Sequence, residues 1–247
     1  MEYTIDNDSW QFWDFYDQDN NYGTYVTDPF YYESSERKGF EKEVFIKIKF
    51  PKNFLLKESL FPTPESFELY MKYEEVFEKL LIQNKVDCKK VHFSIYYGAR
   101  RLLYQVNDNE LFKECLIALE SKMQPFEFEV IENNSWTIFP EFLPNKYDRQ
   151  QIANRDLIRI LAEKGSNLKK EHCINHTFSG KKRNLKKIEK ELSAMNGKTI
   201  SIEKNLLEIS FNEILDEDTI NEMTYICIDF AKEFNCNYDG WSSSLIE

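Results

Sequence analysis

Glycine is scarce in this chain of 247 residues, which has only seven, and the nearest pair is Gly165 and Gly180. The phosphate-binding loops GxGxxG and GxxxxGK[ST] need closely spaced glycines, so neither can be written here. The GxSxG nucleophile elbow and the HExxH zinc helix are also absent. These absences exclude the common nucleotide-binding loops and two large hydrolase classes, and we expect no cofactor.

Cysteine is sparse as well. The five cysteines are scattered and odd in number, which argues against a disulfide framework and for a reducing compartment. The N-terminus MEYTIDNDSW has no positively charged start followed by an apolar stretch, unlike a signal peptide. No apolar run approaches the length of a membrane span. We therefore expect a cytoplasmic protein without membrane association.

Positive charge is in short supply over the first part of the chain. Residues 1–145 hold 26 acidic against 16 basic side chains, a net charge of −10, whereas residues 146–247 hold 17 against 16, a net of −1. An acidic surface repels phosphate, so direct binding of DNA or RNA is not expected. The acidity suits a basic protein partner, or simply keeps the chain soluble.

Apolar and aromatic residues are plentiful, and their spacing predicts the fold. Alternation predicts strands near residues 44–50, 91–97, 102–106 and 126–130, with helices over about 64–83 and from Asp108, the expected cap, to Leu119. After a junction at 140–148 and a helix over about 149–163, the order recurs in 172–241. This predicts an α+β fold of two tandem ferredoxin-like (β-α-β-β-α-β) antiparallel-sheet domains, 1–145 and 146–247.

Three surface features complete this prediction. The aromatic, acidic segment 1–42 is expected to form two strands and to pack on the first domain. The exposed face of that domain's sheet is expected to point away from the helices and to carry Lys47, Lys49, His92, Ser94, Gln105, Glu127 and Glu129. In the second domain, charge segregates between a basic first helix and an acidic start of the second, which either orients a partner or forms a solvated face. The basic residues are Lys181, Lys182, Arg183, Lys186, Lys187 and Lys190.

The best metal candidate is the group His172, Cys173 and His176, with Cys236 as a distant fourth ligand. On a strand, the two histidines share one face and Cys173 points to the other, so convergence needs a distortion. Structural zinc sites usually show paired ligands at close spacing. Two histidines hydrogen-bonded within a sheet face are the simpler interpretation, and we expect no metal.

The remaining candidates for chemistry are weaker. Cys88 lies in a lysine-rich polar loop that favours a thiolate, whereas Cys115 and Cys227 lie on apolar helix faces and are expected to be inert. Arg100 and Arg101 follow a turn and either hold an anion or are simply exposed.

Two further pairs of residues, one acidic and one aromatic, are also weak candidates for a functional site. Asp239 and Glu208 are possible acid–base groups without a definable pocket. Phe93 and Tyr96 superficially suggest an RNA-binding sheet, but the basic and aromatic signature of such a sheet is missing.

The second domain resembles a known family. The resemblance rests on three features: the strand HCINHTFSG (172–180), the order of elements after it, and the ending Tyr238-Asp239-Gly240-Trp241. These resemble the type B regulators of ribonuclease E activity. The resemblance implies a ferredoxin-like fold and inhibition by binding the nuclease, without any reaction.

The first domain carries a second set of distinctive segments: the Trp-rich start, FPTPESFELYMKYEEVFEKL (61–80), GARRLLYQV (98–106), and FEFEV followed by SWTIFPEFLP (135–144). These resemble the domain of unknown function numbered 695, often joined to such a regulator-like domain. That resemblance implies no known activity.

The ending 238–241 also has a physical interpretation. Gly240 permits a backbone turn that a side chain would forbid, Asp239 accepts hydrogen bonds that hold the turn, and Trp241 folds back onto the sheet or a helix. A strand stapled by a tryptophan is the simpler interpretation, and a direct binding hot spot is the alternative.

Three functions follow as hypotheses. The leading one is a non-catalytic regulator that binds a protein partner, a ribonuclease or another basic protein. The rivals are an enzyme with a site between the domains and an acidic immunity-type protein that neutralises a basic toxin. Oligomeric state is left open. The candidate partner-binding residues are His172, His176, Tyr238, Asp239, Trp241, Arg100 and Arg101.

Overall fold

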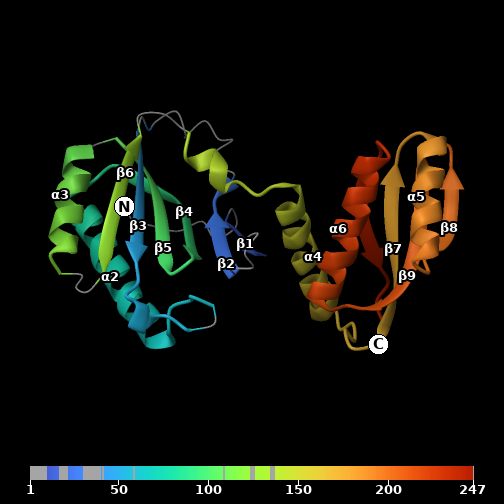
Figure 1. Ribbon diagram of the computed structural model, residues 1–247, viewed down its shortest axis with the longest axis horizontal. Coiled ribbons are helices and arrows are strands. Elements are labelled where there is room, and N and C mark those ends of the chain that lie inside the picture. Colours follow the sequence, from blue (N-terminus) through green and yellow to red (C-terminus); the bar gives the residue numbers. More distant parts are fainter. Residues whose placement is uncertain are drawn as a thin grey trace. The chain divides into compact units, whose positions relative to one another are not determined.

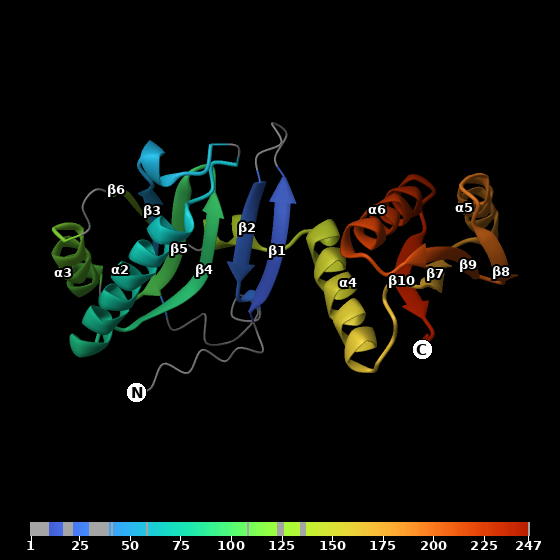
Figure 2. The same cartoon turned by 90° about the horizontal axis from the view of Figure 1, so that it is seen from below.

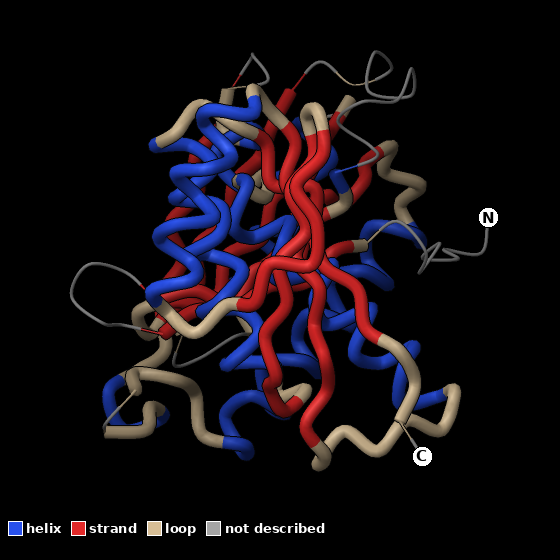
Figure 3. The backbone as a smooth tube through the Cα atoms, turned by 90° about the vertical axis from the view of Figure 1, so that its right-hand side faces the viewer, coloured by secondary structure: helices blue, strands red, loops and turns tan. Residues whose placement is uncertain are grey.

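The computed structural model describes residues 10–16, 22–29, 40, 42–57, 59–107, 109–122, 126–133 and 137–246. The chain divides into two compact units, Met1–Pro144 and Asn145–Glu247, called here unit 1 and unit 2 (Figure 1). Each unit contains both strands and helices (Figure 3). None of the helices described is long and apolar enough to cross a lipid bilayer.

Unit 1 contains one six-stranded antiparallel sheet with the order β1-β2-β4-β5-β3-β6. Strands β3 to β6, with α2 after β3 and α3 after β5, give the β-α-β-β-α-β order and the strand arrangement of the ferredoxin-like fold. This part of the fold prediction is confirmed. The elements are β1 (Gln11–Tyr16), β2 (Tyr22–Thr27), β3 (Lys42–Lys49), η2 (Lys52–Phe54), α2 (Pro64–Gln83), β4 (Cys88–Tyr96), β5 (Ala99–Val106), α3 (Asn109–Glu120), β6 (Glu127–Asn133) and η3 (Phe139–Phe142).

The main core of unit 1 lies between this sheet and helices α2 and α3. Alternate residues of β3, including Val44 and Ile46, meet Phe77 of α2 and Phe112 of α3, and all four are almost fully buried. Helix α2 begins at Pro64 because the Thr63 hydroxyl accepts the Ser66 N–H, as the sequence predicted. Asp108, the expected cap of α3, lies outside the described residues.

The N-terminal hairpin packs on unit 1 as a direct extension of its sheet. Strand β2 pairs with β4, with Val26 opposite Phe93, and β1 pairs with β2. For residues 11–16 and 22–27, the prediction that this aromatic segment packs on the first domain is confirmed, and the rest of 1–42 lies largely outside the described residues. The hairpin makes the sheet two strands wider than the ferredoxin-like core.

The other face of this sheet is only partly exposed. Lys49, Glu127 and Glu129 are exposed on it as predicted, but the prediction is wrong for three other residues. His92, Ser94 and Gln105 point away from α2 and α3, but each is at most 1 % exposed. They are buried because the segment carrying η3 folds over them and packs Phe139 and Phe142 against the sheet in a second, smaller core. The sequence pattern could not show which segment would cover this face.

Unit 2 contains a four-stranded antiparallel sheet with the order β10-β7-β9-β8, again ferredoxin-like. Helices α5 and α6 lie on the same side of it (Figure 2). The core of this unit is formed by Phe178, Leu185, Ile188 and Ile209, all fully buried. The elements are α4 (Lys146–Glu163), β7 (Glu171–Ser179), α5 (Lys182–Ala194), β8 (Lys198–Glu203), β9 (Leu206–Ile214), α6 (Glu217–Glu233) and β10 (Asn237–Ser243).

Helix α4 begins three residues before the expected start at residue 149. Asn145 caps it by accepting the N–H groups of Tyr147 and Asp148, and Asp148 accepts the Asn145 N–H in return. This capping box lies at the end of the stretch 140–148 expected as a junction, and the two units divide within that stretch, between Pro144 and Asn145. Helix α4 packs against α6, on which Asn221 and Thr224 are buried in addition to the apolar stripe.

Candidate functional site

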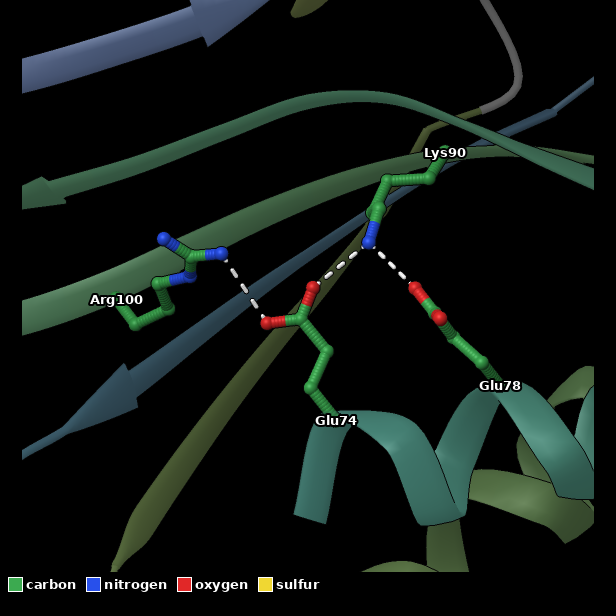
Figure 4. A network of polar contacts seen from close by, with 4 residues as sticks. All are labelled: Glu74, Glu78, Lys90 and Arg100. Atoms are coloured by element: carbon green, nitrogen blue, oxygen red, sulfur yellow. Dashed lines mark hydrogen bonds and ion pairs between the residues drawn. The ribbon is translucent and has the colours of Figure 1, made fainter. Parts of the chain in front are cut away.

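Arg100 lies in a buried ion-pair network, which contradicts its interpretation as an exposed turn. Its side chain is 5 % exposed, and its Nη2 donates to Glu74 of α2 at 3.2 Å. Lys90 of β4 donates to the other oxygen of Glu74 at 2.7 Å and also to Glu78 (Figure 4). The guanidinium stacks 4.4 Å from the Phe93 ring, on the helix side of the sheet. Phe93 is thus unavailable as part of an RNA-stacking surface.

Charge is balanced within this network. Burial acts to raise the pKa of Glu74, but Arg100 and Lys90 outweigh it, so the pKa lies below the ordinary value. Burial acts to lower the pKa of Lys90, but Glu74 and Glu78 hold it above the ordinary value. Glu74 and Lys90 therefore keep their charges near neutral pH, and the network sets two acidic side chains against two basic ones. A closed network of this kind stabilises one packing of α2 on the sheet and leaves no free charge for an anion.

Arg101 is half-buried on the opposite face of the sheet. It donates to the Tyr96 carbonyl at 2.8 Å and lies over the Tyr96 ring at 4.8 Å. A small cavity lies between the sheet and the helices of unit 1. It is lined by apolar side chains together with Glu74 and Tyr70, and neither Arg100 nor Arg101 lines it. Among the described residues, the two arginines lie on opposite faces of the sheet, and this cavity does not reach either of them.

His172 and His176 both point from β7 into the interior of unit 2, and each is at most 1 % exposed. His172 lies between the Asn167 carbonyl, 3.2 Å from Nε2, and the Ser243 hydroxyl, 3.3 Å from Nδ1. Nδ1 of His176 lies 2.9 Å from the Tyr238 hydroxyl. The prediction of two hydrogen-bonded histidines on one sheet face is confirmed.

A Cys–His pair lies in the same interior, with Cys227 Sγ 3.7 Å from Nδ1 of His176. An activated pair would hold a thiolate beside an imidazolium. Here burial raises the pKa of Cys227 and lowers the pKa of His176 to about 4, so both groups are neutral near pH 7. The pair is inert, in agreement with the expectation for Cys227.

The candidate metal ligands do not converge. Cys173 is exposed on the face of β7 opposite to His172 and His176, and Cys236 packs beside Gly180. Within the part of the chain that the structure describes, no group of three or more potential ligands could hold a metal ion.

The prediction that Cys88 lies in a polar loop is wrong. Cys88 is the first residue of β4 and is buried in the main core of unit 1, so its thiol is not an exposed loop thiolate.

The ending 238–241 forms most of β10 and is built around a bulge. Pairing with β7 shifts between Tyr238 and Gly240, where Gly240 has a φ of +110°, a value that favours glycine. Asp239 is exposed at the bulge and accepts a hydrogen bond from the Ser179 hydroxyl at 3.1 Å. Trp241 is 9 % exposed and points to the helices.

Asn154 of α4 is the residue that Trp241 reaches, and sequence reasoning missed it. Its Oδ1 accepts the Trp241 indole N–H at 2.7 Å, and its Nδ2 donates to Asn221 and Thr224 of α6 at 2.8 and 2.9 Å. Gln150 also donates to Oδ1. A fully buried amide with all its hydrogen-bonding groups satisfied ties α4, α6 and β10 together.

Comparison with known proteins concerns this same region. Residues 151–243 match the family described as Regulator of ribonuclease activity B. The match begins within α4 and ends at the last residue of β10, so it contains both Asn154 and Trp241. It covers less than half of the chain and leaves unit 1 unmatched.

The other comparisons add little. No curated protein matches the chain. A crystal structure of an unknown protein from Galdieria sulphuraria is 9 % identical over 84 % of this chain and 99 % of that one, with a TM-score of 0.22. A likeness at that level supports no statement about fold or function.

Proposed function

We propose that this chain is a non-catalytic, cytoplasmic regulatory protein that binds a ribonuclease, or another component of RNA decay, through unit 2. The observation that carries the proposal is the match of residues 151–243 to the Regulator of ribonuclease activity B family. Members of that family act by binding ribonuclease E and not by turnover. The matched segment is a closed structural unit, from α4 to β10, and so can serve as a complete binding module.

The chemistry of unit 2 supports a binding role. The groups that could do acid–base or nucleophilic work, His172, His176 and Cys227, are buried and hydrogen-bonded or neutral. A catalytic site needs such groups beside an accessible pocket. Their positions here serve packing, which favours a binding role for unit 2 over the enzyme hypothesis.

The candidate partner-binding residues then divide by accessibility. Asp239 is exposed and Tyr238 is half-buried, so these two can touch a partner directly. His172, His176, Trp241 and Arg100 are at most 9 % exposed and act by holding the surface in shape. Unit 1, with its excess of acidic residues, is proposed to widen the contact toward basic parts of the partner.

The test is a cleavage assay with purified ribonuclease E, a labelled RNA and increasing amounts of the full chain. A saturable fall in the cleavage rate is expected, together with a complex of the two proteins by light scattering. An unrelated ribonuclease serves as control, because an equal loss of its activity would show that the chain sequesters RNA. Unchanged cleavage and no complex at about 10 μM of each protein would refute the proposal.

Two variants distinguish a residue that touches the partner from a residue that only stabilises unit 2. Asp239→Ala removes an exposed carboxylate and leaves the interior unchanged, so it should weaken inhibition without lowering stability. Trp241→Phe removes the hydrogen bond to Asn154 and should lower stability, while inhibition persists at temperatures where the variant remains folded. The opposite pattern would make Trp241 the contact residue.

A further inference from the structure

Helix α5 carries a strongly basic exposed face. Its buried side consists of Leu185, Ile188 and Leu192, each 0 % exposed. The helical period places a continuous row of cations on the opposite side. This basic face of α5, exposed throughout, comprises Lys182, Arg183, Lys186, Lys187 and Lys190, with Lys181 at the N-cap.

None of these six cations takes part in an ion pair with any residue that the structure describes. Lys187 makes the one contact of note, with its Nζ 5.6 Å from the Phe234 ring centre. Elsewhere in unit 2, Arg155 pairs with Glu217 and Arg159 with Glu163. The chain has 43 acidic residues against 32 basic ones, so the lack of partners on α5 does not reflect a shortage of carboxylates.

The placement of these charges opposes helix stability. The first turn of α5 has no acidic residue and begins with Lys182 and Arg183, at the end where the helix dipole is positive. Lys182 and Lys186, Arg183 and Lys187, and Lys186 and Lys190 are like charges four residues apart, which repel on a helix. Helix stability does not require this arrangement.

Helix α6 in the same unit shows the favourable pattern. It has Asp216 at the N-cap, Glu217 and Asp218 in the first turn, and Lys232 in the last. Both helices pack on the same side of one sheet, so a general property of the fold does not explain the charges of α5. A local conflict with stability of this kind marks a functional surface.

The sheet of unit 2 argues against a nucleic acid as the ligand. Proteins that bind single-stranded RNA on a sheet stack bases on exposed aromatic side chains. Here Phe178, Phe211 and Trp241 are at most 9 % exposed and point to the helices, and Tyr238, the other aromatic residue of these strands, is half-buried against the same core. The face of β7 away from the helices carries small polar side chains and a thiol: Cys173, Asn175, Thr177 and Ser179.

We propose that the basic face of α5 binds an acidic polypeptide segment of the protein partner. From Lys182 to Lys190 the face extends about 12 Å along the helix, the length of about four residues of extended chain. Carboxylates along such a segment would meet the unpaired cations and relieve their mutual repulsion. This inference rests on the proposed function in requiring a protein partner, but not on that partner being a ribonuclease.

The experiment measures binding of the full chain to a short fluorescent peptide rich in glutamate, by anisotropy at low and high salt. Salt-sensitive binding is expected, because the contacts are between exposed charges. The triple variant Lys182→Glu, Lys186→Glu and Lys190→Glu should weaken it at least ~10-fold. The same variant should unfold at a higher temperature than the parent chain, since the reversal at residue 182 suits the helix dipole and the repulsion between like charges is reduced.

The matched control reverses three exposed lysines elsewhere in unit 2, Lys164, Lys169 and Lys204, with the same change in net charge. It should keep peptide binding within about twofold of the parent, because non-contacting surface charges act only at long range. Equal loss in both variants would overturn the inference, as would no binding by the parent chain. Binding of a labelled single-stranded RNA but not of the peptide would overturn it as well.

The outcomes also separate this inference from the proposed function. If the peptide binds α5 but ribonuclease cleavage is unaffected, the acidic ligand belongs to another protein and the proposed function fails alone. If the α5 variant inhibits the ribonuclease as well as the parent chain does, while peptide binding is absent, the inference about α5 fails alone.

Discussion

The indole N–H of Trp241 donates to Oδ1 of Asn154 at 2.7 Å and so joins the last strand of unit 2 to its first helix. The bond bridges 87 residues and lies in the interior, where Asn154 is 0 % exposed. Helix α4 lies outside the β-α-β-β-α-β order, and this bond, together with the packing of Leu161 against Ile220 and Trp241, holds it in the unit. It also gives the tryptophan of the 238–241 ending a structural role.

Replacing Asn154 with Ala should lower the free energy of unfolding by about 2–4 kcal/mol, because the Trp241 N–H loses its acceptor and Asn221 loses a donor. Trp241→Phe should cost about 1–3 kcal/mol, since Asn154 keeps its other partners. Urea unfolding measures both. Ser242→Ala, at an exposed neighbour on β10, is the control and should stay within about 0.5 kcal/mol of the parent. If Asn154→Ala left the free energy of unfolding unchanged, the role assigned to this contact would be wrong.

Glu43 plays the corresponding role in unit 1. Its side chain is 0 % exposed, and its carboxylate accepts the N–H groups of Thr137, Ile138 and Phe139 at 3.1, 2.9 and 3.0 Å. These are donors at the start of η3, the segment that covers the sheet. The carboxylate therefore holds this covering segment on the strand β3.

Glu43→Ala should lower the free energy of unfolding by about 2–5 kcal/mol, because three backbone donors lose a charged acceptor. It should also speed hydrogen exchange at Thr137, Ile138 and Phe139 before global unfolding, since η3 is released first. Hydrogen exchange with mass spectrometry measures this. Glu129→Ala removes a carboxylate from the half-exposed pair with Lys47 and should leave exchange in 137–139 unchanged. Equal protection in the parent and Glu43→Ala chains would disprove the anchoring role.

These two contacts show where prediction from the sequence ends. Strands such as β3 and helices such as α2 follow from local alternation and spacing, so the ferredoxin-like order of both units was predictable. Glu43 and Phe139 are 96 residues apart, and no local pattern links them. Polar side chains are ordinarily placed at the surface, so Asn154 was not predicted to be buried.

The candidate sites show the same limit. The alternation of β7 was enough to place His172 and His176 on one face and Cys173 on the other. Arg100 looked exposed because it follows the turn at Gly98, but the length of α2 brings Glu74 over that strand. The burial of a charge depends on which element lies above it, and this is a property of the tertiary fold.

The buried histidines predict how stability depends on pH. Burial lowers the pKa of His176 from 6.5 to about 4, and the pKa of His92 also lies well below its usual value. At His176, the unfolded chain therefore binds a proton near pH 6.5 that the folded chain does not bind until about pH 4. The free energy of unfolding should fall as pH decreases through this window, with His176 contributing about 3 kcal/mol.

Urea unfolding at several pH values between about 7 and 4 tests this, because stability in that window tracks the histidine protons. His176→Gln removes one titrating group, so its stability should change less steeply with pH than that of the parent, even if it is lower throughout. Parallel curves for the two chains would show that His176 is not responsible for the slope.

Thiol labelling provides a direct test of the described interior. Cys173 is exposed, whereas Cys88, Cys115 and Cys227 are buried, and burial raises the pKa of Cys115 and of Cys227. Since the thiolate is the reactive form, a disulfide reagent should label Cys173 fastest in the folded chain and the buried thiols only as the chain unfolds. Cys173→Ser should remove the fast phase and leave the slow phases unchanged. Rapid labelling of Cys227 in the folded protein would show that the Cys227–His176 pair is accessible, and would reopen the case for chemistry in unit 2.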